Sequence, residues 1–129
     1  MAKSLLLDTC ALLWLGGAPE QLSATAKRRI EEADFVYASP ISLWEVTFKC
    51  ELGKLQLATA PEEWFELLKE DFGITVLPLT EAIAAKAARL PLNHRDPADR
   101  FIIASALIHQ LPVVTGDRRF PLYGVTTLR

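Results

Sequence analysis

The chain has 129 residues, of which 50% are hydrophobic and 23% are charged, and its formal net charge is −2 at pH 7. This length is typical of one domain, and the hydrophobic content excludes a mainly disordered protein. No hydrophobic run approaches the roughly 20 residues that a membrane-spanning helix needs. The slight negative charge argues against broad electrostatic binding to nucleic acid, although it leaves room for a local basic site.

The N-terminus and the cysteines favour a cytoplasmic protein. Asp8 follows only three leucines, so we do not expect a secretory signal at the N-terminus. Cys10 and Cys50 are too few for a disulfide framework, and both lie in hydrophobic helical patterns. We therefore expect one domain over residues 1–129, in a reducing cytoplasm.

Short hydrophobic segments alternate with helical patterns along the chain. Ser23, Ser39 and Thr80 are predicted helix caps, and proline or glycine residues mark the turns. In chain order we predict a strand at 5–8, a helix at 10–15, a helix from the Ser23 cap to about residue 33, a strand at 35–38, a helix from 40 to 52, a helix at 61–72, a strand at 74–77, a helix from the Thr80 cap to 90, a helix at 97–109, and strands at 112–115 and 125–128.

The spacing of hydrophobic residues predicts the buried face of each helix. The helix at 40–52 carries a stripe formed by Ile41, Trp44, Phe48 and Leu52, and the helix at 61–72 is predicted to direct inward Trp64, Leu67 and Leu68. The helix at 97–109 is hydrophobic almost all round, so we expect it to be central and buried. We interpret the three tryptophans as core or interface residues: Trp14, Trp44 and Trp64.

This alternation of strands and helices favours an α/β fold with a central, mostly parallel sheet and helices on both faces. In such sheets, ligands bind at the carboxyl ends of the strands, near the point where the strand order reverses. We therefore expect a functional site at this edge.

Four acidic residues are predicted to lie at this edge. Asp8 ends the first strand and Asp117 follows the strand at 112–115, whereas Glu45 and Asp99 lie near the starts of two helices. Two carboxylates about 5 Å apart repel by about 3 kcal/mol at an effective dielectric constant of about 20. Such a group therefore either takes up protons or binds a divalent cation.

The available ligand types favour Mg²⁺ or Mn²⁺ over zinc. Carboxylate oxygens are hard ligands that suit these ions. The only histidines are His94 and His109, and no cysteine–histidine spacing typical of a zinc site is present.

Each acid also has a purely structural interpretation, and these alternatives stay open. Glu45 could close a capping box with Ser42. Asp96, which precedes Pro97, is a predicted N-cap of the helix that carries Asp99 at its favourable end. Asp8 with Thr9 could cap the next helix, and Asp117 after Gly116 could form a turn.

Several basic residues near these acids could bind RNA phosphates. The candidates are Arg95, Arg100, Arg118, Arg119, Lys49 and Lys54. Solvated surface charge or ion pairing with nearby acids is the alternative for each, and a carboxylate partner is the specific alternative for Arg100. His94 could touch RNA, or it could be a loop histidine without a role.

Four segments together resemble PIN-domain ribonucleases of the VapC toxin type. They are LLDTCALLW at 6–14, SLWEV at 42–46 with LGKL at 52–55, HRDPADR at 94–100, and VTGD at 114–117. The resemblance covers nearly the full length and implies a PIN-like three-layer sandwich. It departs from the family pattern at Ala98, where related sequences often have an aromatic residue.

The resemblance also implies an activity and partners. It implies metal-dependent cleavage of RNA phosphodiester bonds, with Asp8, Glu45, Asp99 and Asp117 binding Mg²⁺ or Mn²⁺. The supporting residues that it implies are Thr9, Asp96 and Thr115. A cognate antitoxin protein, whose tail fills the acidic groove, and a homodimer are the implied protein partners.

Other chemistries have less support. A receiver domain needs an acidic pair at its first strand, and an aspartyl phosphatase needs an acid two residues after its nucleophile, whereas Asp8 is followed by Thr9 and Cys10. A phosphate-binding GxxxxGK[ST] loop is absent from the sequence. The remaining alternative is a non-catalytic PIN-like module that binds nucleic acid or protein.

Overall fold

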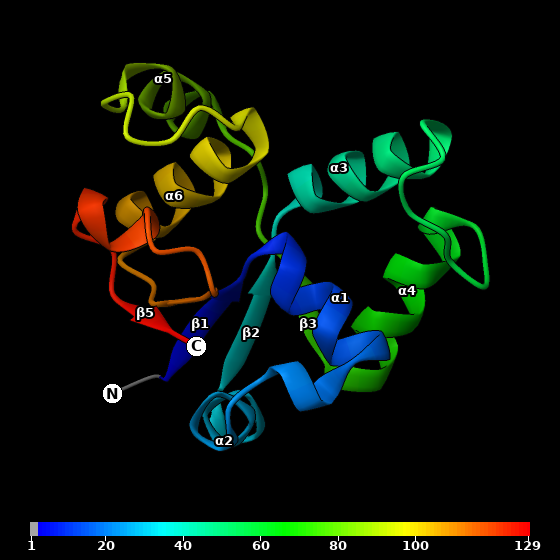
Figure 1. Ribbon diagram of the computed structural model, residues 1–129. Coiled ribbons are helices and arrows are strands. Elements are labelled where there is room, and N and C mark those ends of the chain that lie inside the picture. Colours follow the sequence, from blue (N-terminus) through cyan, green and yellow to red (C-terminus); the bar gives the residue numbers. More distant parts are fainter. Residues whose placement is uncertain (1–2) are drawn as a thin grey trace.

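The computed structural model describes residues 3–129 and has a five-stranded sheet at its centre (Figure 1). The strand order is β3 (Ile74–Val76), β2 (Phe35–Ala38), β1 (Ser4–Leu7), β4 (Val113–Val114) and β5 (Thr127–Leu128). Each neighbouring pair is parallel, which confirms the predicted sheet type. Residues 1 and 2, part of the segment judged not to be a secretory signal, lie outside the described residues.

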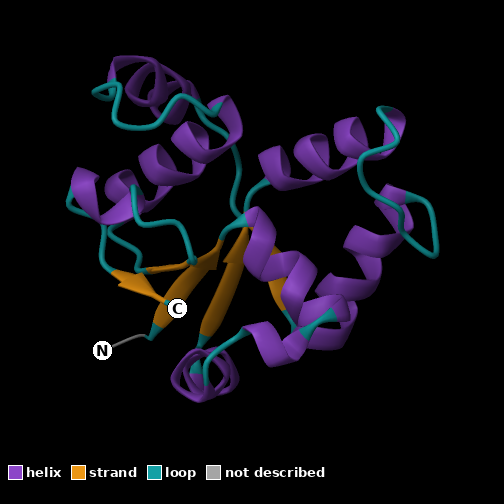
Figure 2. Ribbon diagram, viewed as in Figure 1, coloured by secondary structure: helices purple, strands orange, loops and turns teal. Residues whose placement is uncertain are grey.

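Within residues 3–129, six α-helices and two 3-10 helices connect the strands (Figure 2). The α-helices are α1 (Thr9–Gly17), α2 (Ala24–Glu32), α3 (Pro40–Glu51), α4 (Pro61–Phe72), α5 (Glu81–Arg89) and α6 (Pro97–His109), and the 3-10 helices are η1 (Pro19–Gln21) and η2 (Phe120–Tyr123). Their starts follow local signals, because side chains of Ser23, Ser39 and Thr80 accept hydrogen bonds from the first turns of α2, α3 and α5. The 3-10 helices were not predicted. Within the described residues, no helix combines the length and the hydrophobicity required to cross a bilayer.

The helices form two layers around the sheet, as Figure 1 shows. Successive side chains of β1 point to opposite faces. Leu7 packs in one hydrophobic cluster with Leu12 of α1 and Leu68 of α4, whereas Leu6 packs in a second cluster with Ile102 of α6. This arrangement is the predicted three-layer sandwich.

The strand order brings the carboxyl ends of β1 and β4 to the edge where the site was predicted. The chain builds the sheet from β1 toward β2 and β3, and later adds β4 and β5 on the other side of β1. The strand order therefore reverses at β1, and the carboxyl ends of β1 and β4 lie side by side. Asp8 and Asp117 follow these two ends.

The predicted burial of two helices was partly wrong. Trp44 and Phe48 of α3 are 51% and 49% exposed and stack on each other, while Glu45 and Val46 are buried. In α4, Leu67 was predicted to face inward but is 43% exposed, whereas Phe65 is buried at 5% exposed. The periodicity detects a hydrophobic stripe, but the contacts of α3 with α1, α4 and α6 determine which side of the helix is covered.

Candidate active site

Asp8 caps a helix and also faces the other acids. It is 3% exposed, and its Oδ1 accepts a hydrogen bond from the backbone N–H of Ala11 at 2.8 Å, so it is the N-cap of α1. Burial raises the pKa of Asp8 to about 6, and the charges of Asp117 and Glu45 act in the same direction. Hydrogen bonds from Thr115 and Ala11 oppose this effect. The capping interpretation is confirmed, and it coexists with a place at the predicted site.

Glu45 projects from α3 and is not part of a helix cap. The N-cap of α3 is Ser39, so the predicted capping box with Ser42 is wrong. Ser42 lies inside the helix and hydrogen bonds through Oγ to Oγ1 of Thr9 at 2.9 Å, which joins α3 to α1. Glu45 is 8% exposed, and its Oε2 accepts a hydrogen bond from Nζ of Lys49 at 3.0 Å.

Asp96 and Asp99 come from the start of α6. Asp96 is the N-cap, as predicted, because its Oδ1 accepts a hydrogen bond from the backbone N–H of Ala98 at 3.0 Å. Burial, followed by the neighbouring charges of Asp96, Glu45, Asp8 and Asp117, raises the pKa of Asp99 to about 8. Asp99 therefore binds a proton more readily than Asp8 or Asp117 does.

Asp117 lies in the loop after β4 and is held by hydrogen bonds on both sides. Its backbone N–H donates to Oγ1 of Thr115 at 3.0 Å, and its carboxylate accepts hydrogen bonds from the backbone N–H and the guanidinium of Arg119. Burial alone would raise the pKa of Asp117, but hydrogen bonds from Arg119 and His94 lower it to about 2. At this site, Asp117 is thus a permanent negative charge.

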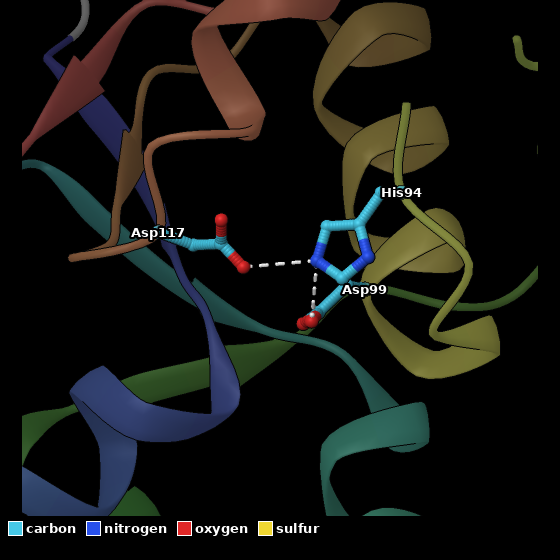
Figure 3. A group of neighbouring side chains, drawn as sticks. All are labelled: His94, Asp99 and Asp117. Atoms are coloured by element: carbon cyan, nitrogen blue, oxygen red, sulfur yellow. Dashed lines mark hydrogen bonds and ion pairs between the residues drawn. The ribbon is translucent and has the colours of Figure 1, made fainter. Parts of the chain in front are cut away.

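His94 connects two of these acids (Figure 3). Its Nε2 lies 2.9 Å from Oδ2 of Asp99 and 2.9 Å from Oδ2 of Asp117. The residue is 2% exposed, although it precedes α6 in a loop. His94 is therefore a buried histidine with defined partners in the fold, and its role at the site stays a prediction.

The predicted acids meet in one cavity of about 440 Å³. Its lining comprises Asp8, Thr9, Cys10, Trp14, Glu45, Lys49, Asp96, Asp99, Gly116, Asp117, Arg119 and Arg129. All four acids of the predicted set are included, together with Asp96 and Thr9. The expected convergence of these side chains at the carboxyl edge of the sheet is present in the structure.

The basic residues predicted near the acids divide into two groups. Lys49 and Arg119 line the cavity, whereas Arg95 lines a separate hollow beside α5. Arg118 and Lys54 are exposed residues outside the lining of the acidic cavity. Arg100 donates hydrogen bonds to the carbonyl oxygens of five residues, Ala87, Ala88, Leu90, Pro91 and His94, so its guanidinium is committed to the backbone. This geometry argues against both the phosphate contact and the carboxylate partner expected for Arg100.

The donor atoms of the cavity fit a hard divalent cation. Oε1 of Glu45 is buried without a hydrogen-bond partner in the described part of the chain, and such an atom is costly unless a ligand satisfies it. The carboxylate oxygens around it suit Mg²⁺ or Mn²⁺. Burial, with a further contribution from Asp8, raises the pKa of the Cys10 thiol to about 11, so Cys10 remains protonated and does not offer a soft ligand.

Three residues of this region carried little or no sequence signal. His94 and Arg119 were noticed only because they flank acids, and Arg129 was not singled out although it lines the cavity. The HRDPADR segment is the one signal that could have assigned His94, because it places the histidine five residues before Asp99. Its bridging position depends on Asp117, 23 residues away.

Comparison with known proteins identifies relatives over most of the chain. A family described as PIN domain matches residues 5–125. The ribonuclease VapC22 of Mycobacterium tuberculosis is 36% identical over 117 residues, which cover 90% of this chain and 88% of that protein.

Solved structures share the fold at lower sequence identity. A chain of VapBC2 from Rickettsia felis, bound to a fragment of promoter DNA, superimposes with a TM-score of 0.72 at 11% identity and covers 96% of both chains. A chain of DNA-bound VapBC from Salmonella typhimurium gives a TM-score of 0.69 at 20% identity, with coverage of 98% of this chain and 97% of that one. These similarities extend the agreement in fold over nearly the whole chain.

Proposed function

The chain belongs to the PIN-domain family, and from this premise we propose that it is an endoribonuclease that depends on Mg²⁺ or Mn²⁺ and acts as the toxin of a toxin–antitoxin pair. The observation that supports this proposal most directly is the meeting of four carboxylates in one cavity, with a buried and unpartnered oxygen on Glu45. The 36% identity to a ribonuclease supports the same substrate class.

We propose that the four acids bind the cation together. Asp8, Asp99 and Asp117 would hold the cation, and Glu45 would add a further oxygen from α3. A bound cation supplies positive charge beside the phosphate and lowers the pKa of a coordinated water. Asp8 and Asp99, whose pKa values lie at about 6 and 8, must lose their protons before they bind it. Hydrogen bonds with Thr115 and Arg119 fix the position of Asp117.

We propose that two cationic side chains at the cavity contact the RNA backbone. Lys49 and Arg119 line it, and each pairs with an acid of the site, Glu45 and Asp117 respectively. Each side chain has further N–H groups, which would be available to phosphate oxygens while the acid stays paired. Arg95, Arg118 and Lys54 lie outside this lining, so we propose for them only contacts farther along a bound RNA.

Cleavage of RNA by purified protein tests the proposal. We expect cleavage of total cellular RNA with Mg²⁺ or Mn²⁺, loss of cleavage with EDTA, and a loss of about 100-fold or more in Asp99→Asn. Asp71→Asn, at an exposed position of α4, is the matched control that should cleave normally. Undiminished cleavage by Asp99→Asn would overturn the site assignment, and absence of cleavage by the native protein would favour a non-catalytic binding module.

The partner is tested separately. We propose that an antitoxin with a basic segment covers the acidic cavity in the cytoplasm, because opposite charges at an interface favour association. Co-expression with the adjacent open reading frame should yield a stable complex and restore growth. Growth that is normal when the chain is expressed alone would count against a toxin.

A further inference from the structure

We propose that His94 is a positioning residue that orients Asp117 by donating its Nε2 N–H to that carboxylate, while the same nitrogen lies 2.9 Å from the carboxylate of Asp99. This inference rests on the function proposed above, because it assigns the two acids to one cation site. His94 Nε2, Asp99 and Asp117 also form a group compact enough to hold a metal ion directly, with their ligand atoms within 4.8 Å of one another. His94 could therefore coordinate the cation itself, or it could hydrogen bond to the carboxylates that coordinate the cation.

The hydrogen bonds of the imidazole make this distinction. Nδ1 of His94 accepts a hydrogen bond from the backbone N–H of Asp96 at 3.2 Å. A neutral imidazole has one accepting and one donating nitrogen, so an accepting Nδ1 places the proton on Nε2. Nε2 is also the atom that lies 2.9 Å from Oδ2 of both Asp99 and Asp117. A protonated Nε2 donates to Asp117 and has no lone pair for a metal ion.

The imidazole is held in this orientation from several sides. The backbone N–H of His94 donates to Oη of Tyr123 at 2.7 Å, and its carbonyl oxygen accepts a hydrogen bond from Nη1 of Arg100 at 2.9 Å. The ring also packs edge-to-face on Phe120, with centroids 6.0 Å apart. A donor with so little freedom can fix the orientation of the groups that it contacts.

The Nε2 atom of His94 contacts acids from two different parts of the chain. Asp99 belongs to α6 and Asp117 to the loop after β4, and one nitrogen contacts Oδ2 of each (Figure 3). The two carboxylates are thereby kept together although both carry, or can carry, negative charge. When a cation binds, Asp99 and Asp117 would supply carboxylate oxygens to it, and the N–H of His94 would keep Asp117 oriented. Outer donors of this kind typically change metal affinity by about 10- to 100-fold when they are removed.

The test compares two variants of His94 by Mn²⁺ binding, measured calorimetrically without RNA. His94→Leu removes the donor, and we expect it to bind Mn²⁺ about 10- to 100-fold more weakly. His94→Gln retains an N–H donor at a similar reach and should recover most of the affinity. His109→Gln, at the exposed end of α6, is the matched control with unchanged affinity. Thermal unfolding in EDTA reports whether each variant is folded.

Native affinity in His94→Leu, or equal losses in the Leu and Gln variants, would overturn the positioning role. These results leave the nuclease proposal intact, since that proposal is judged by RNA cleavage. Absence of Mn²⁺ binding by the native protein would overturn both.

A measurement on the native protein keeps the inference testable even if His94→Leu does not fold. ¹⁵N NMR of the histidine rings should show a proton on Nε2 and none on Nδ1, both in EDTA and with Mg²⁺. A ring that loses the Nε2 proton when Mg²⁺ binds, or ¹⁴N coupling of His94 to Mn²⁺ in pulsed EPR, would identify His94 as a ligand and refute the proposal.

Discussion

Replacing Asp8 with asparagine should stabilise the metal-free protein, and the gain should depend on pH. Burial raises the pKa of Asp8 from 3.8 to about 6, so its contribution to stability is fully present below about pH 4 and is lost as the pH rises through about 6. The difference between these pKa values corresponds to about 3 kcal/mol of unfolding free energy at about pH 8. Asparagine has no charge to desolvate, and it caps helices as well as aspartate does.

The assay is thermal or urea unfolding in EDTA at about pH 5 and about pH 8. For a chain of this size, Asp8→Asn should raise the melting temperature by about 10 °C at the higher pH and by about half as much at the lower pH. Mg²⁺ should then stabilise the native protein but not the variant, because the variant lacks a charged ligand. The exposed substitution Asp71→Asn serves as the control and should behave like the native protein at both values.

The reasoning would be refuted if Asp8→Asn destabilised the protein equally at both pH values. That result would mean that the capping hydrogen bond to Ala11 outweighs the desolvation of the carboxylate.

Three further predictions concern the site and its surroundings. Mn²⁺ affinity should rise between about pH 5 and about pH 8, because the pKa values of Asp8 and Asp99 are raised to about 6 and about 8 and both groups must lose their protons on binding; a flat calorimetric profile would contradict these shifts. Arg100→Lys should lower the urea midpoint by an amount equivalent to about 2–3 kcal/mol, since lysine cannot reproduce the guanidinium contacts to several carbonyls; an unchanged midpoint would exclude this role. In urea unfolding, Trp44→Ser should change the free energy of unfolding by about 0.5 kcal/mol or less, whereas Phe65→Ala should lower it by about 3 kcal/mol or more. A larger loss in Trp44→Ser than in Phe65→Ala would contradict the burial of these two side chains in the structure.

Local signals determined most of the secondary structure. Pro61 and Phe72 bound the predicted and the observed α4, and Pro97 and His109 bound α6 in both. Such boundaries depend on caps, prolines and hydrophobic spacing within about one turn of the chain, so they are legible without tertiary contacts. The meeting of Asp8 with Asp117 was also predictable, because neighbouring parallel strands bring their carboxyl ends to one edge.

Tertiary structure alone decided which face of α3 is exposed and which groups Arg100 and His94 contact. The hydrophobic stripe of α3 was legible, but its exposure depends on where α1, α4 and α6 pack. Arg100 and His94 were visible as a charge and a ring near acids, yet their partners are backbone carbonyls in one case and two distant carboxylates in the other. The physical reason is that periodicity and capping are set by neighbours in sequence, whereas a hydrogen-bond partner is chosen among all groups that the folded chain brings within about 3 Å.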